Sequence, residues 1–164
     1  HPAALSPTKF IHSVHNAVSG HWGIGTACTQ PSVAIASHQH TFAMGLLEAA
    51  SQCITSQAPV LLVAYDVQTL GPIAQLTTSE GRMAVAMVLA PMANASSSHQ
   101  LILDATTCDK RPRPTPLSGL ANNALADALP CLDALACASK GQSLVLGFPL
   151  SKDTCWTLTV ESLA

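Results

Sequence analysis

Charged and aromatic residues are both scarce in this chain. Only 10% of its 164 residues are charged, against about 25% in an average soluble domain, and only 4% are aromatic. The net charge of −2 gives no reason to expect nucleic acid as a partner, and 48% apolar residues exclude a disordered tail. We therefore expect a core of aliphatic side chains. We also expect another protein to cover part of the apolar surface, because so few charges cannot cover it.

The sequence also shows no membrane span, no signal peptide and no closely spaced pair of cysteines. No segment reaches 18 consecutive apolar residues, and no basic segment is followed by an apolar one. The cysteines have no C-x2-C spacing, and reduced, mostly buried thiols of a cytoplasmic protein are favoured over disulfides, which are the weaker alternative. They are Cys28, Cys53, Cys108, Cys131, Cys137 and Cys155.

Helices and apolar strands alternate along the chain, which predicts the α/β class. Helices are expected over 8–23, 41–56 and 120–139, where Pro130 either kinks the last helix or opens a second one. Strands are expected over 32–36, 60–65, 83–89, 101–105, 143–148 and 154–160. We expect 60–65 to be a central strand covered on both faces, and the last two strands to form a hairpin with one wet face.

Three parts of the chain follow from this pattern. Residues 1–105 form one lobe, and 106–119 form a proline-rich, basic linker. Residues 120–164 form a helix and a hairpin that pack on the same domain.

Histidines gather in the first 40 residues, where His12, His15, His21, His38 and His40 lie. Imidazole is a common zinc ligand. However, the first acidic residue is Glu48, so a closed four-ligand site would lack partners. We expect no metal and no cofactor.

The segment Ser37-His38-Gln39-His40 places a hydroxyl beside two imidazoles at a strand–helix junction. A helix N-terminus stabilises a developing anion, so a catalytic serine nucleophile is one interpretation. The other is that Ser37 and Thr41 cap the helix, since no G-x-S-x-G motif is present. Capping is the commoner use of such residues, and both readings stay open.

Three segments in order resemble the β-ketoacyl synthases of the thiolase-like superfamily. Residues 13–22, Ser-Val-His-Asn-Ala-Val-Ser-Gly-His-Trp, resemble the helix and turn before the nucleophile strand. Residues 32–50 are similar to that strand, the nucleophile turn and the next helix, and 79–89 are similar to the G-E-G-A-A-A-L-V-L motif. The stretch 6–49 is most similar to the short subgroup associated with aryl-polyene and other fatty-acid-type gene clusters. The resemblance implies a layered αβα fold that is incomplete, one lobe with a reduced C-terminal helix and hairpin.

The condensing Cys-His-His triad is absent from this pattern. The family spacing places the nucleophile at Ser37, no cysteine lies within eight residues of it, and no histidine follows residue 100. The resemblance therefore implies a non-condensing subunit similar to a chain-length factor. Such a subunit pairs with an active ketosynthase, or with itself, and shapes the acyl chain. An acyl carrier protein is a further expected partner. A stand-alone acyl-thioester transferase or hydrolase using Ser37 with His38 or His40 is the alternative.

The same resemblance implies which residues face the partner. Segment 32–36 would pair antiparallel with a second subunit, and bulky side chains would limit chain growth in the tunnel. These expected interface and tunnel residues are Trp22, Phe42, Met44, Ser32, Val33, Ala34, Ile35 and Ala36.

Overall fold

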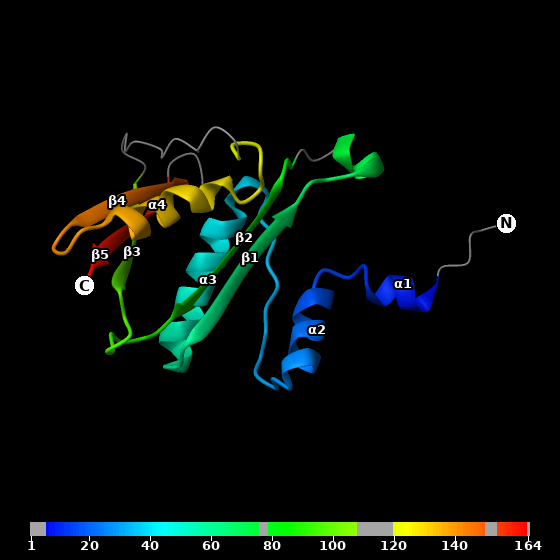
Figure 1. Cartoon of the computed structure of the whole chain (residues 1–164), viewed down its shortest axis with the longest axis horizontal. Coiled ribbons are helices and arrows are strands. Elements are labelled where there is room, and N and C mark those ends of the chain that lie inside the picture. Colours follow the sequence, from blue (N-terminus) through cyan, green and yellow to red (C-terminus); the bar gives the residue numbers. More distant parts are fainter. Residues whose placement is uncertain (1–5, 76–78, 108–119, 150–153, 164) are drawn as a thin grey trace. The chain divides into compact units, whose positions relative to one another are not determined.

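The computed structural model describes residues 6–75, 79–107, 120–149 and 154–163. The chain divides into two compact units, His1–Ala36 and Ser37–Ala164, and each is described by itself. Helices and small sheets occur together (Figure 1), which confirms the predicted α/β class. Most of the predicted linker 106–119 lies outside the described residues, so the predicted division at this linker stays a prediction.

The first unit holds two short helices, α1 (Pro7–Ile11) and α2 (Ala17–Thr26), so the single helix predicted over 8–23 is wrong. Ser13 ends α1, because its N–H and its hydroxyl both donate to the Phe10 carbonyl. Serine side chains compete with helical hydrogen bonds in this way. α2 continues to Thr26, past the predicted end at residue 23, and it includes Gly20 because glycine weakens a helix without forbidding it. Neither helix contains a buried residue.

No strand forms over 32–36, so that prediction is wrong for the described chain. Residues 31–37 have no regular structure, and no described strand pairs with them. An apolar run becomes a strand only when a neighbouring strand completes its backbone hydrogen bonds. Pairing of this segment with a second subunit stays a prediction.

The second unit begins with a 3-10 turn, η1 (His38–His40), which leads into α3 (Thr41–Ser56) with the bounds that the sequence predicts. α3 packs against β1 (Val60–Val67), which pairs antiparallel with β2 (Arg82–Leu89). A short 3-10 helix, η2 (Gly71–Gln75), follows β1.

β1 is not covered on both faces, contrary to the prediction. Its burial alternates along the strand, and Leu61, Val63, Tyr65 and Val67 are exposed. The reason is that α3 packs on the sheet, and the described sheet has only two strands. Alternate side chains of a strand point to opposite faces, so one apolar face is left uncovered.

Three antiparallel strands form the second sheet in the order β3-β5-β4, with bounds β3 (His99–Thr107), β4 (Ser143–Pro149) and β5 (Thr154–Ser162). The predicted hairpin is confirmed, since β4 pairs with β5. The predicted wet face of β5 is less exposed than expected, since Thr159 and Glu161 on it are half-buried. Its Thr157 is buried and donates a 3.4 Å hydrogen bond to the Asp104 carbonyl.

Between β3 and β4, the predicted helix 120–139 is divided. A 3-10 turn, η3 (Ala126–Ala128), precedes α4 (Leu129–Cys137). Pro130 lies in the first turn of α4, so it opens this helix and does not kink a longer one.

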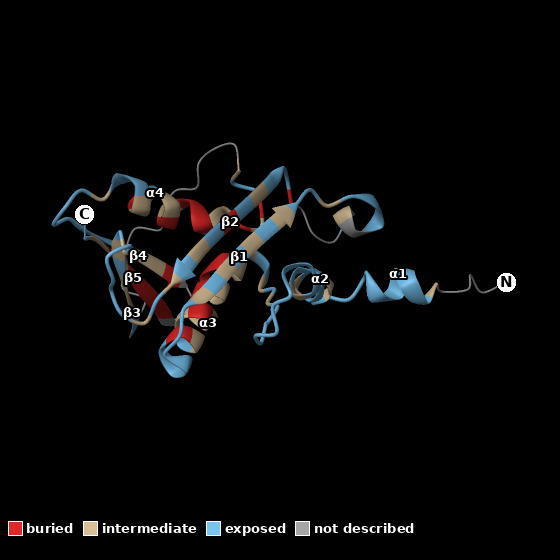
Figure 2. Cartoon of the chain, turned by 60° about the horizontal axis from the view of Figure 1, so that its bottom comes forward, coloured by how far each residue is buried: buried red, intermediate tan, exposed pale blue. Residues whose placement is uncertain are grey.

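Side chains from α3, α4, β2, β4 and β5 form one hydrophobic core in the second unit. Figure 2 colours the buried residues of the chain red. Trp156 and Phe42 are its largest fully buried side chains, and the Phe148 and Trp156 rings lie 4.6 Å apart. The expectation of a purely aliphatic core is therefore wrong. Because each aromatic side chain buries a large area, three of them supply much of the core despite their scarcity.

Candidate functional site

The turn before α3 is where the sequence places its candidate nucleophile. His40 N–H donates to the Ser37 carbonyl at 2.9 Å, and Ser37 N–H donates to Thr41 Oγ1 at 3.0 Å. Thr41 Oγ1 itself donates to the His38 carbonyl at 2.8 Å. His38 has a φ of +52°, which is uncommon for a residue other than glycine. These bonds hold a tight turn at the start of a 16-residue helix.

The turn does not assemble a nucleophile and base. Among the described side chains, neither His38 nor His40 forms a hydrogen bond with the Ser37 hydroxyl. His38 is exposed, and His40 and Ser37 are half-buried. The side chain of Gln39 lies outside the described part. A serine needs a base within hydrogen-bond reach to act as a nucleophile, and this turn does not supply one.

The prediction that Ser37 and Thr41 cap α3 is also wrong. Neither Ser37 nor the N-cap residue His40 caps the helix with its side chain, and Thr41 binds the preceding turn. The Ala43 N–H, at the third position of the helix, donates instead to Asp127 Oδ2 at 2.9 Å. A capping side chain normally accepts from this amide. Here the cap comes from a residue 84 positions away in sequence.

Burial has the largest effect on the pKa of the Asp127 carboxyl. Desolvation raises the pKa of the Asp127 carboxyl above its usual range, while the His40 imidazole and the amides at the start of α3 act in the opposite direction. Its second oxygen, Oδ1, is buried without a hydrogen-bond partner. Burial and the nearby Asp127 charge together raise the pKa of the Cys131 thiol to about 11. Cys131 is therefore a buried, protonated core residue and not a nucleophile.

A hydrogen-bond network holds the segment that carries Asp127. The buried Ser79 hydroxyl donates to Asp66 Oδ2 at the end of β1 and accepts from the Ala124 N–H at 3.1 Å. Asn123 Nδ2 donates to the Glu80 carbonyl at 2.9 Å, and Asn123 Oδ1 accepts from the Leu125 N–H at 3.0 Å. No imidazole takes part, so Ser79 is a structural link between the β1–β2 ends and the approach to η3.

The expected tunnel residues lie in different environments. Trp22 belongs to the first unit and is 57% exposed, and Phe42 is fully buried in the core of the second unit. Met44 is half-buried on α3. In segment 32–36, Ile35 is half-buried and the other four residues are exposed. Their role in a tunnel or an interface stays a prediction.

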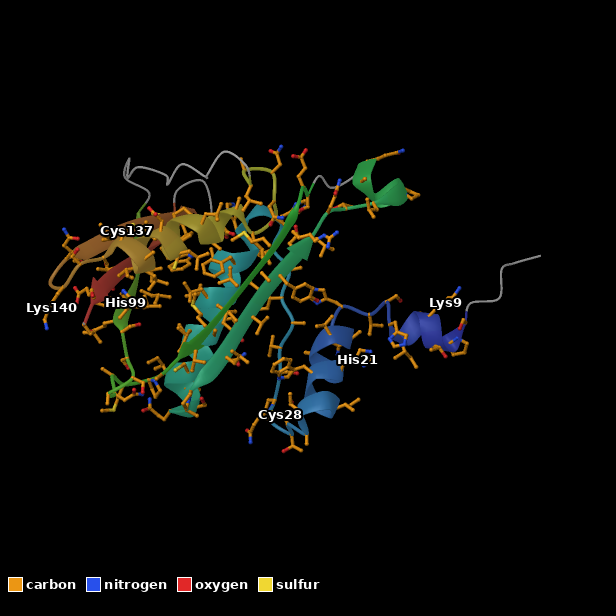
Figure 3. All side chains as sticks on the ribbon, in the orientation of Figure 1. Lys9, His21, Cys28, His99, Cys137 and Lys140 are labelled. Carbon is orange, nitrogen blue, oxygen red and sulfur yellow. The ribbon has the colours of Figure 1, made fainter. Side chains whose placement is uncertain are left out.

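Cysteines and histidines form no metal-binding group of three in the described chain. All five described cysteines are free, with Cys53, Cys131 and Cys155 buried and Cys28 and Cys137 exposed (Figure 3). His12 and His21 are the one close histidine pair in these residues, with Nδ1 and Nε2 3.0 Å apart. None of the described helices combines the length and apolar character needed to cross a bilayer.

The fold and the comparisons together define the class of this chain. A family model described as "Beta-ketoacyl synthase, N-terminal domain" matches residues 2–147, which is most of the chain. The match includes the turn before α3, Asp127 and most of β4. The protein is thus a thiolase-like α/β protein. It belongs to the β-ketoacyl synthase N-terminal domain family. No curated protein and no solved structure matches it.

Sequence reasoning missed Asp127, the residue that defines the start of α3. The segment Ala-Asp-Ala-Leu-Pro reads as an ordinary helix beginning, because an acidic residue before a proline is common there. The one sign of this contact in the sequence is that positions 1–47 contain no acidic residue. No nearby carboxylate can therefore bind the amides at the start of α3.

Proposed function

We propose that this protein is a non-condensing, β-ketoacyl-synthase-like subunit. It pairs with an active ketosynthase, or with a second copy of itself, and shapes the length of the acyl chain made in fatty-acid or polyene biosynthesis. Acyl carrier protein, which delivers such chains, is a further proposed partner. The observation that carries the proposal is the Asp127 carboxylate bound to the Ala43 amide at the start of α3.

Condensing chemistry at this helix would need a thiolate stabilised by the helix N-terminus. Backbone amides and the helix dipole lower a thiol pKa at such a position. In this protein the Asp127 side chain already accepts a hydrogen bond from the Ala43 amide, and its ionisation would add negative charge at that end. No cysteine lies within eight residues of Ser37. Both observations favour a subunit that binds and shapes a chain over one that carries it covalently.

Uncovered apolar side chains support a role in contact with another protein. In the first unit, Phe10, Ile11, Val18, Trp22 and Ile24 are all more than half exposed. Large apolar patches of this kind mark protein interfaces in soluble proteins. The exposed apolar side chains on one face of the β1–β2 sheet form a second group of this kind. The scarcity of charge over the whole chain fits an interface that is apolar like a core.

Pairing is tested by co-expressing the chain with an active ketosynthase of a fatty-acid or polyene cluster. The mass of the purified complex is then measured by light scattering. A heterodimer, or a homodimer of the chain alone, is the expected result. A monomer under both conditions would contradict the proposal.

The chain-length role is tested by product analysis of the reconstituted pair. Replacing half-buried Met44 with alanine should lengthen the products, because it removes bulk from the proposed stop. Met92→Ala is the matched control, since Met92 is 74% exposed in a loop. An unchanged product distribution for Met44→Ala would contradict this role.

The alternative enzyme is distinguished by one variant. A stand-alone transferase or hydrolase would rely on the Ser37 hydroxyl, and its activity on acyl thioesters would be lost in Ser37→Ala. The non-condensing subunit predicts that Ser37→Ala leaves pairing and product length unchanged. Loss of a measurable thioesterase activity in that variant would favour the enzyme instead.

A further inference from the structure

The β1–β2 sheet has one face that packs against the core and one that is exposed. Leu62, Met83 and Met87 lie on the inner face and pack against the core. Figure 2 shows the alternation as pale blue and tan bands along both strands. Residues paired across an antiparallel ladder share a face. The exposed pairs, which together form the outer face, are Leu61 with Val88, Val63 with Ala86, Tyr65 with Ala84 and Val67 with Arg82.

Large and small side chains are separated on the outer face. Every residue that β1 contributes is bulky, whereas β2 contributes Ala84 and Ala86 at its middle. A row of large side chains therefore lies beside a strip of small ones. When two sheets pack face to face, their side chains interdigitate across about 10 Å. A surface that fits the outer face must therefore place large side chains over β2 and small ones over β1.

A second copy of the outer face has this complementary shape. A two-fold axis that lies between the two sheets, parallel to their strands, places β1 of each copy over β2 of the other. The rotation keeps each residue at its own level along the strands. Val63 then faces Ala86 of the other copy, and Tyr65 faces Ala84, because these residues are paired within one chain. Arg82, the one charged residue of the outer face, lies at its end and stays at the solvated rim.

The exposed area of the outer face is large enough for a dimer. Its large apolar side chains, Leu61, Val63, Tyr65, Val67 and Val88, are between 48% and 68% exposed. At roughly 100 Å² for each, together with the two alanines, one copy offers roughly 600 Å² and two copies roughly 1,200 Å². A specific interface needs about 1,000 Å² in total. Because the centre of the face carries no charge, pairing desolvates no ionised group there.

We propose that two copies of this chain pair through their outer faces as a sandwich of two sheets. The inference deepens the proposed function and rests on it in one respect, since a dimer of this chain is one of the two pairings proposed above. It assigns that dimer to a surface other than segment 32–36. A two-fold contact of this kind is closed, so it gives a dimer and not a filament.

Sedimentation equilibrium of the full-length chain alone measures the dissociation constant of its dimer. Val63→Lys should raise this constant at least about 100-fold, tenfold for each copy, because a charge replaces a valine that pairing buries. Ala86→Phe should also weaken the dimer, although it adds apolar surface, because the new ring fills the space that Val63 of the other copy occupies. Both positions are exposed in the chain, so the fold should be retained, which circular dichroism checks.

Val33→Lys is the matched control, because Val33 is a 59% exposed valine of segment 32–36. It should leave the dissociation constant unchanged, and loss of the dimer in this variant alone would assign the pairing to that segment. The outer-face dimer is refuted if the dimer survives Val63→Lys or becomes tighter in Ala86→Phe.

A chain that is monomeric alone also refutes the outer-face dimer. If that chain still forms a heterodimer with an active ketosynthase, the proposed function holds without this inference. If Val63→Lys then disrupts the heterodimer, the occupant of the outer face is the ketosynthase and not a second copy. A monomer under both conditions refutes the inference and the proposed function together.

Discussion

Replacing Asp127 is the most direct test of the assignment of this carboxylate as the distant cap of α3. Asp127→Ala removes the acceptor of the Ala43 N–H and leaves that amide unpaired in a half-buried place. Loss of a capping side chain costs about 1–2 kcal/mol in unfolding free energy. An unsatisfied amide brings the expected total to about 1–3 kcal/mol. Asp127→Asn keeps an oxygen for the Ala43 amide but cannot ionise, so it isolates the effect of the charge.

The pH dependence of folding stability follows from the raised pKa of the Asp127 carboxyl, and burial is the main cause of that rise. A carboxyl with a higher pKa in the folded state binds more protons when folded than when unfolded. Folding stability from this group is therefore present at low pH. It is lost as the pH rises from the usual aspartate pKa of about 3.9 through the raised value. The unaltered chain should thus lose stability relative to Asp127→Asn as the pH rises above about 4.

Urea unfolding at several pH values, followed by tryptophan fluorescence, measures this difference. Comparing variants cancels the titration of groups that they share. Asp133→Asn is the matched control, because Asp133 is exposed on the nearby α4. His40→Gln removes the imidazole that opposes the shift, so the loss of stability should then extend to higher pH. If the unaltered chain instead gains stability over Asp127→Asn as pH rises, the charged cap outweighs burial and the reasoning is wrong.

Three further predictions concern the core, a thiol and a turn. Trp156→Ala should lower the unfolding free energy by about 3–5 kcal/mol, while Trp22→Ala, at an exposed position, should change it little, as urea titrations would show. The Asp133 carboxylate raises the pKa of the exposed Cys137 thiol. Asp133→Asn should therefore speed thiol labelling at Cys137 at pH 8, measured by mass spectrometry. An unchanged labelling rate would contradict the role of Asp133. Gly81 has a φ of +75°, so Gly81→Ala should cost about 1–2 kcal/mol in thermal or urea unfolding, and a neutral result would show that the turn can relax.

The local sequence pattern correctly predicts the elements whose backbone hydrogen bonds form within one helix or between two adjacent strands. α3 needs no partner for its backbone, and its bounds are predicted correctly. The β4–β5 hairpin is also predicted correctly, because a short connection brings the two strands together. Periodicity fails over 8–23, where the Ser13 hydroxyl ends a helix that apolar spacing alone would continue.

Contacts between distant parts of the chain decide features that the local sequence pattern cannot predict. An apolar run indicates that a strand is buried somewhere, but it does not say on how many faces. β1 has more exposed apolar residues than predicted, because α3 packs on the sheet and the alternate side chains of β1 stay exposed. β5 has fewer exposed polar residues than predicted, since Thr157 is buried between the flanking strands. Segment 32–36 has no neighbouring strand among the described residues and forms none. The cap of α3 likewise comes from a contact between residues 84 positions apart, which no window of sequence contains.

The same contact explains why a thiol alone would not restore a nucleophile at the start of α3. His40 is the N-cap residue of the helix, and its imidazole acts to lower the pKa of Asp127. A thiol introduced by His40→Cys would gain from the helix dipole, but the Asp127 carboxylate would oppose its ionisation. Adding Asp127→Asn should therefore lower the pKa of the new thiol and increase its alkylation rate by iodoacetamide at pH 7. The rate is read by mass spectrometry against exposed Cys28 in the same chain. Equal rates in the single and the double variant would show that Asp127 does not control the charge at this end of the helix. The physical argument for a non-condensing subunit would then be reduced to the missing cysteine.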